Sequence, residues 1–551
     1  MTAQLKQNLD LIETTSENWK QRIFSISTSE EPDYQIFNEI ELHKQGRSPL
    51  IVIMGVENIG ALRTIQSDLR RFTAIVAEPD LTRLKHLLVH RDLTNLLEER
   101  NIVFVAGDNV KRLGDQLEMY FTIAMIDSIK TIKPLESRAD EFQEAFENLD
   151  IFRRSADANR STVEKFLTDW HVYFAQNLED YLNSPSLSHW NNALEGETVT
   201  IVGPGPSIDQ EEQQLKTLAD GWIIALDTAL PLLNKLDIVP EIVVSVDVGQ
   251  ANRPFVAEFP NSSYLVCPAY MDPHVRKKAK EAFLFEARFP PIQWINRYIE
   301  SPGYLPLSGS VSTAALGLVR MLNPAQCYLL GLDLTTPGFL THSRQLPDYE
   351  RILSKLNRFK TIPSILYQQI QERIVQTVET PTGPVLTTEQ YLHWKEFLES
   401  MIERCEFPFF RLGKAILPME GTKMTRRIHN FQPQSNDSLP VIRENRLHKP
   451  KQWKRRAREL FDRIQQVRIE LKTIASKARR GHPIENEWLQ FAGSLGEHEE
   501  FLEYFQWEID RLTQELQQIQ STDSLQATAH KQFQRWITLL EETEKGFKGL
   551  L

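Results

Sequence analysis

The sequence predicts an α/β protein with two Rossmann-like domains, each built on a parallel sheet, followed by an all-α C-terminal domain. Apolar runs rich in β-branched residues alternate with amphipathic segments in two parts of the chain, which is typical of strands joined by crossover helices. After Pro450 prolines nearly vanish, and Leu, Gln, Glu, Arg and Lys dominate, which favours helices. The 551 residues allow such a division, since a domain has roughly 100–200 residues.

The first predicted domain covers residues 1–190. Between residues 49 and 128, apolar runs occur in the segments PLIVIMGVENIG, TAIVAEPD, NIVFVAGDN and MYFTIAMIDS, with amphipathic stretches between them. This cadence predicts parallel strands with crossover helices. A charge-mixed stretch from about residue 137 to residue 184 has apolar residues at helical spacing and is expected to form a helical linker.

The second predicted domain covers residues 191–428 and is expected to carry the chemistry. Its strand candidates are TVTIVGPGPSID, GWIIALDTAL, EIVVSVDVGQ, SYLVCPAY and AQCYLLGLDLTTPG, and each ends in Gly, Pro, Asp or Thr, where the chain must turn. Ligands of open parallel sheets bind beyond the carboxyl ends of the strands. We therefore look for functional residues where these strands end.

The third predicted domain covers residues 440–551. Basic residues outnumber acidic ones in 443–481, and the reverse holds in 482–551. We expect a basic helix that folds back on acidic helices. Two alternatives remain open: a docking surface for a protein partner, and contact of KPKQWKRRAR at 449–458 with an anionic surface.

Composition narrows the class of protein. The net charge of −11 disfavours a general nucleic-acid binder. Cys267, Cys327 and Cys405 are too far apart for a disulfide framework or a CxxC metal site, which fits a reducing cytoplasm. The N-terminus does not resemble a signal peptide, and the longest uncharged stretch, 301–319, contains Pro, Gly and Ser. We expect a cytoplasmic protein without a membrane span.

A glycine- and proline-rich loop directly after the strand TVTI is the strongest local signal. Its glycines allow close approach of a ligand to the backbone, and Ser207 with Asp209 is expected to cap the next helix and leave its amides free for phosphate. The loop lacks the third glycine of GxGxxG and the lysine of a P-loop, so a tight structural turn is the alternative. The candidate nucleotide-binding residues here are Gly203, Gly205, Pro206 and Ser207.

Acidic residues end two further strands. Asp227 follows IIAL and Asp247 follows IVVSV, where a carboxylate could accept hydrogen bonds from ribose or position an acceptor. A capping or turn role is equally open for each. Gly309 and Ser310 precede a helix of small residues, whose amides and hydroxyls could hold an anion, with ordinary capping as the alternative.

Asp333 closes the strand AQCYLLGL, and His342 follows in a polar loop. We nominate His342 as a general acid or base because the ordinary pKa of histidine lies near neutrality, although a solvated loop histidine is the alternative. The catalytic candidates of the chain are Asp247, Asp333 and His342.

The segments GPGPSID, DTALPLL, PEIVVSVDVGQ, SGSVSTAALGLV and GLDLTTPGFLTH, in this order, resemble the motility associated factor (Maf) flagellin glycosyltransferases. The domain of that family is similar to archaeal 6-hydroxymethylpterin pyrophosphokinases, which are MptE-like, and more distantly to bacterial sialyltransferases that use CMP-sialic acid. The resemblance covers about residues 197–422. Ile208, where the family usually has Leu, and Leu332, where it commonly has a polar residue, depart from the pattern.

The resemblance implies a cytoplasmic enzyme that moves a nonulosonic acid, of the pseudaminic or legionaminic type, from a CMP donor to Ser or Thr of flagellin. Its partners would be flagellin and the CMP-nonulosonic acid, with no cofactor beyond this donor. The GPGPS loop would bind the nucleotide, Asp227 and Asp247 would line the site, and Ser310 would face the carboxylate or phosphate of the donor. Asp333 and His342 match the pattern Gly-x-Asp-Leu…His of the family.

Two other functions stay open. One is pyrophosphoryl transfer from ATP to a pterin-like alcohol, for which Asp227, Asp247 and Asp333 could recruit Mg²⁺. The other is a non-catalytic flagellin-binding module. The second domain has no D-x-D pair and no cluster of His and acids with metal-ligand spacing, so we expect transfer without a metal.

The first domain carries a pattern that imitates a nucleoside site. Glycines at 55 and 60 follow its first strand, and Glu78 ends the second, where a ribose would be held. We interpret this domain as structural or acceptor-orienting. A vestigial methyltransferase-like pocket is the alternative.

Overall fold

The computed structural model of the chain describes most of its residues. The described residues are 13–14, 50–59, 73–90, 93, 102–118, 129–247, 249–287, 289–307, 309–371, 375–380, 383–413, 416–425, 428, 438–443, 446–480, 482–495, 498–517 and 522–551. They form two compact units, Met1–Glu164 and Lys165–Leu551, which are described in turn. The predicted boundaries near residues 190 and 428–440 stay predictions.

The first unit contains a parallel sheet in the order β1-β4-β3-β2-β5. The predicted strands at 50–54, 73–78 and 102–106 are confirmed, and the one predicted within 119–128 lies outside the described residues. The strands are β1 (Glu13–Thr14), β2 (Leu50–Met54), β3 (Thr73–Glu78), β4 (Ile102–Ala106) and β5 (Ile129–Ile132).

Helices cover this sheet, and its strands read as continuous apolar runs because both faces are buried. Its core includes Phe142, directly before the long helix α7, and Leu149 within it. The helices are α4 (Leu81–His90), α6 (Leu113–Glu118) and the first part of α7 (Gln143–Asn183), which is the predicted linker helix and continues into the second unit.

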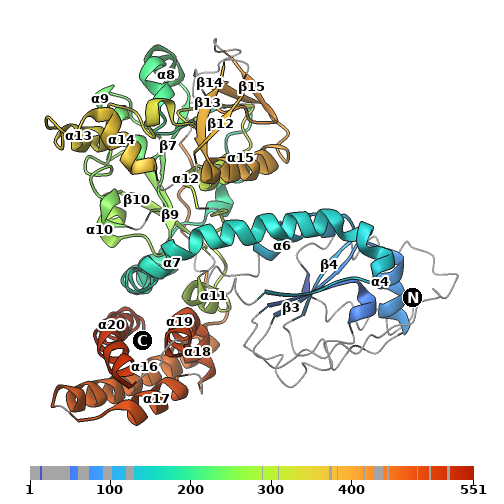
Figure 1. Cartoon of the computed structure of the whole chain (residues 1–551), viewed down its shortest axis with the longest axis vertical. Coiled ribbons are helices and arrows are strands. Elements are labelled where there is room, and N and C mark those ends of the chain that lie inside the picture. Colours follow the sequence, from blue (N-terminus) through green and yellow to red (C-terminus); the bar gives the residue numbers. More distant parts are fainter. Residues whose placement is uncertain are drawn as a thin grey trace. The chain divides into compact units, whose positions relative to one another are not determined.

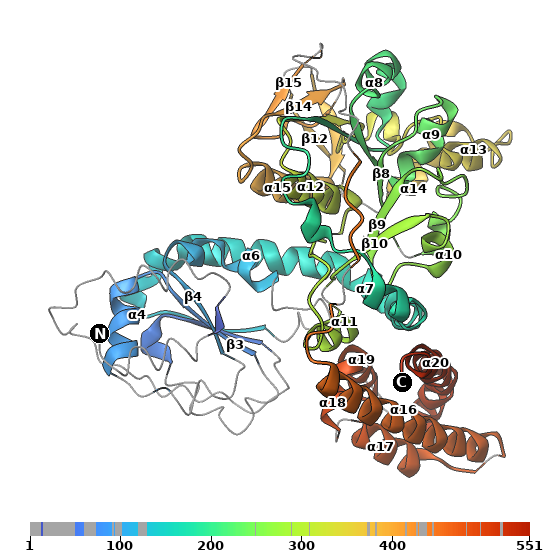
Figure 2. The same cartoon turned by 180° about the vertical axis from the view of Figure 1, so that it is seen from behind.

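The second unit is built on an eight-stranded sheet in which every pair of neighbouring strands is parallel (Figures 1 and 2). Its order is β10-β9-β8-β7-β6-β11-β14-β15, so the chain moves outward from β6 in one direction and then returns to β11 on the other side. The strands are β6 (Thr198–Val202), β7 (Trp222–Leu226), β8 (Ile242–Val244), β9 (Tyr264–Pro268), β10 (Glu281–Phe285), β11 (Gln326–Leu330), β14 (Phe409–Leu412) and β15 (Thr422–Met424).

The fold class predicted from the sequence is confirmed, and the five strands expected in this sheet are all present. Strands β10, β14 and β15 were not predicted. Helix α12 precedes β11 and packs against β6, β7 and β8, so it covers the sheet's centre. Two antiparallel strands, β12 (Val375–Val378) and β13 (Val385–Thr388), form a separate small sheet before α15. The helices here are α8 (Glu212–Leu218), α9 (Leu230–Lys235), α10 (Pro273–Arg276), α11 (Pro290–Asn296), α12 (Val311–Leu322), α13 (Pro347–Leu353), α14 (Ile362–Ile370) and α15 (Glu389–Ile402).

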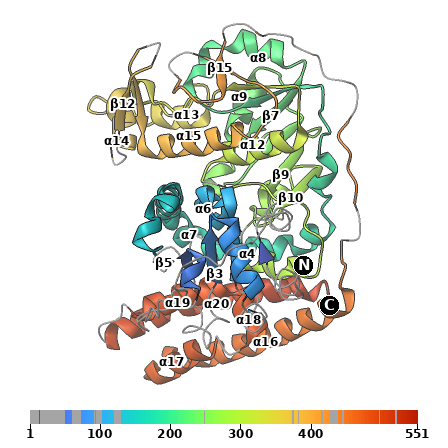
Figure 3. The same cartoon turned by 90° about the vertical axis from the view of Figure 1, so that its right-hand side faces the viewer.

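The chain ends in a group of helices that lie side by side (Figure 3). As expected, a basic helix folds back on acidic ones: in α16, Lys472 pairs with Glu541 of α20 at 2.6 Å and Arg468 pairs with Glu544 at 2.9 Å. None of the helices in the described part of the chain is long and apolar enough to cross a membrane. The helices are α16 (Pro450–Arg479), α17 (Glu485–Ser494), α18 (Glu499–Tyr504), α19 (Gln506–Gln517) and α20 (Thr522–Lys548).

Helix α20 also packs closely on the last part of α7. A Cβ atom on Gly546 would lie 2.3 Å from the carbonyl oxygen of Ala175, so only glycine fits there. The carboxylate of Glu542, one turn earlier, accepts a hydrogen bond from the Gln176 amide at 2.8 Å. The two helix backbones therefore touch without intervening side chains.

A buried histidine lies where α7 meets the terminal helices. The His171 ring stacks on Phe505 with centroids 5.6 Å apart and meets the edge of Phe289 at 4.5 Å. Neither of its nitrogens has a hydrogen-bond partner among the described residues. Burial, together with the charges of Arg511 and Arg535, holds the pKa of His171 well below its usual value.

This environment makes stability depend on pH. Below about pH 6.5, His171 becomes protonated in the unfolded chain but stays neutral in the folded chain. The free energy of unfolding should therefore fall as the pH is lowered from 7 to 5. His171→Phe should weaken this dependence, whereas His530→Gln, at an exposed position of α20, should preserve it. Thermal unfolding measured across this pH range checks the expectation. Equal pH slopes in wild type and His171→Phe would contradict it.

Candidate functional site

The site predicted from the sequence lies at the carboxyl edge of the second unit's sheet, between β6 and β11. The strand order reverses there, because β7 lies on one side of β6 and β11 on the other. At such a switch point the loops leave in opposite directions and open a crevice beyond the strand ends. The loops that flank it are residues 203–211 after β6 and 331–336 after β11.

The glycines of these loops bring the two backbones into contact. The amide of Gly203 donates to the carbonyl of Leu330 and that of Gly205 to the carbonyl of Gly331, both at 2.8 Å. Gly331 has a φ of 69°, and a Cβ on it would lie 2.3 Å from the Gly203 carbonyl oxygen. These glycines were expected to admit a ligand, but their Cβ sides are occupied by the neighbouring loop. Here they permit one loop to approach the other.

Asp333 fastens the loop that follows β6. Its carboxylate accepts hydrogen bonds from the backbone amide of Ser207 at 2.6 Å and from the Ser207 hydroxyl at 2.5 Å. Burial raises the pKa of Asp333, and these hydrogen bonds together with the Arg411 guanidinium oppose the rise. Arg411, itself 1% exposed, donates to the carbonyl oxygens of Leu332, at 2.6 Å, and Leu417. Asp333 therefore holds the loop with both carboxylate oxygens.

The expected capping by Ser207 and Asp209 is wrong. The 3-10 turn Pro206–Gln210 has Gly205 at its N-cap with no side-chain hydrogen bond, because the Ser207 hydroxyl goes to Asp333. The Asp209 carboxylate instead accepts from the Ser343 hydroxyl and from the amide of Arg344, the latter at 3.1 Å. Amides of the loop at positions 203, 205, 207 and 208 all donate within the protein, so they are not free for phosphate.

Asp227 forms a second buried cluster at the neighbouring strand ends. Its carboxylate accepts hydrogen bonds from the Ser245 hydroxyl at 2.5 Å, the Asn252 amide at 2.7 Å and the backbone amide of Thr228 at 2.7 Å. Burial raises the pKa of Asp227 to about 6, although these hydrogen bonds favour the ionised form. Asp227 is fully buried. Because its partners lie after β7 and after β8, its hydrogen bonds hold these two loops together.

Sequence reasoning missed Ser245 and Asn252. A signal exists in the pattern SVDVGQAN, because Ser245 lies two residues before Asp247 and so on the same side of the chain. Asp247 itself is exposed, and among the described residues its carboxylate accepts a short-range hydrogen bond from the Gly249 amide, at 2.9 Å. Its charge adds to the rise in the pKa of Asp227. Asp247 is thus the solvent-facing carboxylate of this cluster.

Gly309 and Ser310 stand at the start of α12. The Ser310 hydroxyl accepts from the amide of Ser312 at 3.3 Å, so Ser310 is the N-cap. Gly309 is exposed and has a φ of 75°. Because α12 leads directly into β11, it runs antiparallel to the strands and begins on the carboxyl side of the sheet, as expected. The capping role is observed, and an anion role stays a prediction.

His342 lies in the loop between β11 and α13. The amide of the next residue, Ser343, donates to the Pro204 carbonyl at 2.7 Å, which ties this segment to the loop after β6. The Nδ1 atom of His342 lies 3.6 Å from the Asp348 carboxylate, and its side chain lines a cavity beside α13 and α14. The partner of His342 is Asp348, that of Asp247 is the Gly249 amide and that of Asp333 is Ser207, so the three catalytic candidates have different partners.

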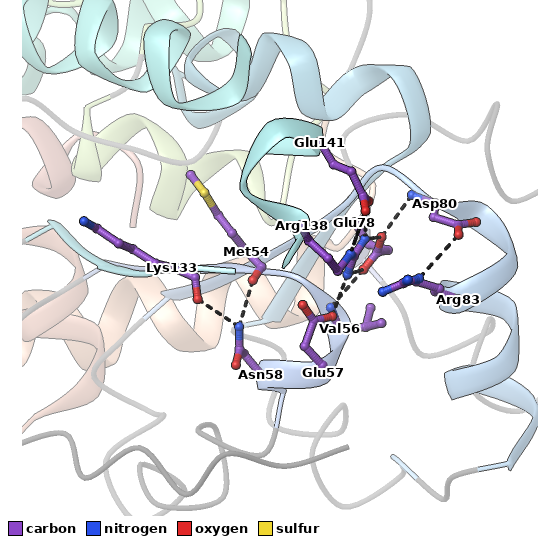
Figure 4. Close-up of polar contacts among 10 residues, drawn as sticks. All are labelled: Met54, Val56, Glu57, Asn58, Glu78, Asp80, Arg83, Lys133, Arg138 and Glu141. Atoms are coloured by element: carbon purple, nitrogen blue, oxygen red, sulfur yellow. Dashed lines mark hydrogen bonds and ion pairs between the residues drawn. The ribbon is translucent and has the colours of Figure 1, made fainter. Parts of the chain in front are cut away.

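The nucleoside-like pattern of the first unit holds an arginine instead (Figure 4). The guanidinium of Arg138 contacts Glu57 at 2.6 Å, Glu78 at 2.6 Å and Glu141 at 2.7 Å. Glu78, 0% exposed, also accepts from the amides of Val56 and Asp80. The carboxylate that would hold a ribose is fully engaged, which favours the structural interpretation of this domain. Gly60 lies outside the described residues.

Part of the second unit matches a known family. Residues 173–338, which include β6 to β11 and the loops of the switch point, match the family model described as 6-hydroxymethylpterin diphosphokinase MptE-like. This match agrees with the MptE-like domain that the sequence motifs predict, whereas a similarity to sialyltransferases is not shown.

Solved structures also match, among them "Structure of MAf glycosyltransferase from Magnetospirillum magneticum AMB-1". It is 15% identical, has a TM-score of 0.40, and the alignment covers 100% of this chain and 83% of that chain. A likeness of this size does not establish a shared activity. No sequence among the curated proteins matches the chain.

Proposed function

We propose that the chain is a glycosyltransferase that moves a nonulosonic acid from a CMP-activated donor to Ser or Thr of flagellin. The observation that carries the proposal is the contact between the loops after β6 and β11, because it brings the motif-bearing segments together at one sheet edge. The family-model match over residues 173–338 and the resemblance to the Maf enzymes support it. In this proposal the enzyme works in the cytoplasm and needs no cofactor beyond its donor.

The chemistry assigns different roles to the site residues. Departure of CMP leaves an oxocarbenium-like sugar, so the acceptor hydroxyl needs a base and the leaving phosphate needs stabilisation. Asp247 is the proposed base because it is exposed, whereas His342 would serve an acceptor that enters from the side of α13. The positive end of the α12 dipole, with Ser310, would stabilise the leaving phosphate. Asp333 positions the loop 203–211 and does not react.

A second candidate is pyrophosphoryl transfer to a pterin-like alcohol, which the description of the matched family favours. This reaction normally recruits Mg²⁺ through one or two carboxylates that bridge it to the phosphates. Asp247 is the exposed carboxylate available for it. The two candidates differ in donor, because one consumes a CMP-sugar and the other consumes ATP.

Intact-mass measurement of flagellin, from cells with and without this gene, tests the proposal. Deletion should remove mass in steps of one nonulosonic acid, and wild type should restore it. Asp247→Asn should restore it weakly, since loss of a general base lowers the rate by roughly 10²–10⁴-fold. Asp237→Asn, an exposed control in the turn after α9, should restore it fully.

An unchanged flagellin mass on deletion would overturn the proposal. Release of AMP from ATP by the purified chain with 6-hydroxymethylpterin would then support the second candidate. Binding of flagellin without any transfer would support the non-catalytic module.

A further inference from the structure

A cavity of about 380 Å³ lies between the segment 340–343 and the helices α13 and α14. These helices have a small apolar core of their own, which Leu340 joins. The wall of the cavity also contains His342, the cationic side chains Arg351 and Lys355, and Asp348, whose carboxylate pairs with Arg351 and lies 3.6 Å from His342. The apolar residues of the wall are Leu340, Ile352, Leu366 and Ile370. The cavity thus combines an apolar lining with an ion pair, Arg351–Asp348, and the cationic side chain of Lys355.

Large apolar side chains are exposed on the same helices and on the turn between them. Phe359, at that turn, is 78% exposed, and Tyr367 on α14 is 51% exposed. Leu353 and Leu356, each next to a cavity-lining residue, are 43% and 39% exposed. Exposed apolar groups gathered next to a cavity mark an interaction surface. We call Leu353, Leu356, Phe359 and Tyr367 the hairpin face.

The charge around the hairpin face is positive, although the whole chain carries −11. Lys355 and Lys360 are exposed, and the Arg358 guanidinium lies 4.4 Å from the centroid of the Phe359 ring. Between residues 351 and 360 there are basic residues and no acidic ones. A partner that complements this surface in charge carries acidic groups beside apolar side chains.

The position of the cavity indicates what the partner is. His342 forms part of its wall, and Ser343 connects the same segment to the loop 203–211 through Pro204 and Asp209. A chain segment held on the hairpin face would therefore lie beside His342 and close to the loop 203–211. The acceptor polypeptide is the substrate that has to be brought to that place.

We propose that the cavity and the hairpin face bind the acceptor polypeptide, through a segment in which an apolar side chain stands beside acidic residues. The apolar side chain enters the cavity, and the carboxylates face Lys355 and Arg358. The identity of this polypeptide as an acceptor rests on the proposed function, whereas its binding does not.

The test uses the full-length chain and purified flagellin as the probe. Phe359→Ser and Lys355→Glu should each weaken flagellin binding roughly tenfold in a surface biosensor, since an exposed anchor residue and its neighbouring charge contribute most to such contacts. In the transfer assay the KM for flagellin should rise by a similar factor while kcat changes less. Ile469→Ser, a control at a 61% exposed position on α16, should change neither.

Each outcome decides between alternatives. Equal flagellin binding by wild type, Phe359→Ser and Lys355→Glu, or none by wild type, overturns the proposal. Flagellin binding that depends on the hairpin face without any sugar transfer keeps this proposal and rejects the proposed function. Loss of binding to phosphatidylserine-containing vesicles in Phe359→Ser, with flagellin binding unchanged, makes the face a membrane-contacting surface and also overturns it. Matching thermal unfolding curves exclude misfolding, since Phe359 is exposed.

Discussion

Replacing Arg138 with methionine should lower the free energy of unfolding of the unit Met1–Glu164 by about 3–5 kcal/mol. The guanidinium is 3% exposed and contacts Glu57 and Glu78, whose side chains are 3% and 0% exposed. Removing it leaves two buried carboxylates next to each other without a cation, and neither water nor another charge compensates them. Even with Arg138 present, one carboxylate oxygen of Glu57 has no hydrogen-bond partner among the described residues. The cluster therefore has no spare donor that could replace the guanidinium.

Denaturant unfolding and limited proteolysis of the full chain check this expectation, since the first unit should be cleaved at lower denaturant concentration. Arg83→Met is the matched control, because Arg83 pairs with Asp80 at 3.5 Å on the surface and such pairs contribute at most about 1 kcal/mol. Adding Glu57→Gln and Glu78→Gln to Arg138→Met should recover part of the loss, since the charges are then gone. A loss no larger than that of Arg83→Met would show that the cluster is not a stabilising element.

Replacing Asp333 with alanine should cost about 3 kcal/mol and abolish transfer. The substitution deprives the buried amide and hydroxyl of Ser207 of their acceptor, and it removes the negative charge nearest to the buried Arg411. The loop 203–211 then loses its anchor to the loop after β11, so the two motif-bearing loops should no longer be held together. Both effects follow from one side chain.

Thermal unfolding and the mass shift of flagellin measure the two effects. Asp220→Ala, at an exposed position after α8, is the control and should change neither. Ser207→Ala separates the causes, because it removes the hydroxyl hydrogen bond and keeps the bond from the Ser207 amide, so its cost should be about 1 kcal/mol. If Asp333→Ala unfolds like wild type, Asp333 does not hold the loop.

Strand position and the location of the site could be predicted from the sequence. Apolar runs such as TVTIV and WIIAL are long enough to specify buried parallel strands, and their ends place Asp227, Asp247 and Asp333 at one edge. Strand β10 was missed because EAFLF contains Glu, Ala and Leu, which are good helix formers, and its pairing with β9 overrides that preference. Local sequence does not reveal such a partner.

The roles of individual polar residues were harder to predict. The local sequence of an aspartate at a strand end does not distinguish a carboxylate that faces solvent from one that holds a loop. Asp247 is of the first kind, and Asp227 and Asp333 are of the second. The difference lies in hydroxyls and amides supplied from distant parts of the chain. The role of Arg411 was missed for a related reason. Arginine is rarely buried, and its partners here are backbone carbonyls, which cannot be recognised from a pattern of side chains.

The hydrogen bonds of Asp209 to Ser343 and Arg344 have an energetic consequence for two-substrate binding. A nucleotide that shifts the loop 203–211 also shifts the segment beside the hairpin face, and an acceptor held there shifts the loop. Linkage then requires that each substrate change the affinity of the other by the same factor. The coupling between donor and acceptor binding would then depend on a single carboxylate, that of Asp209.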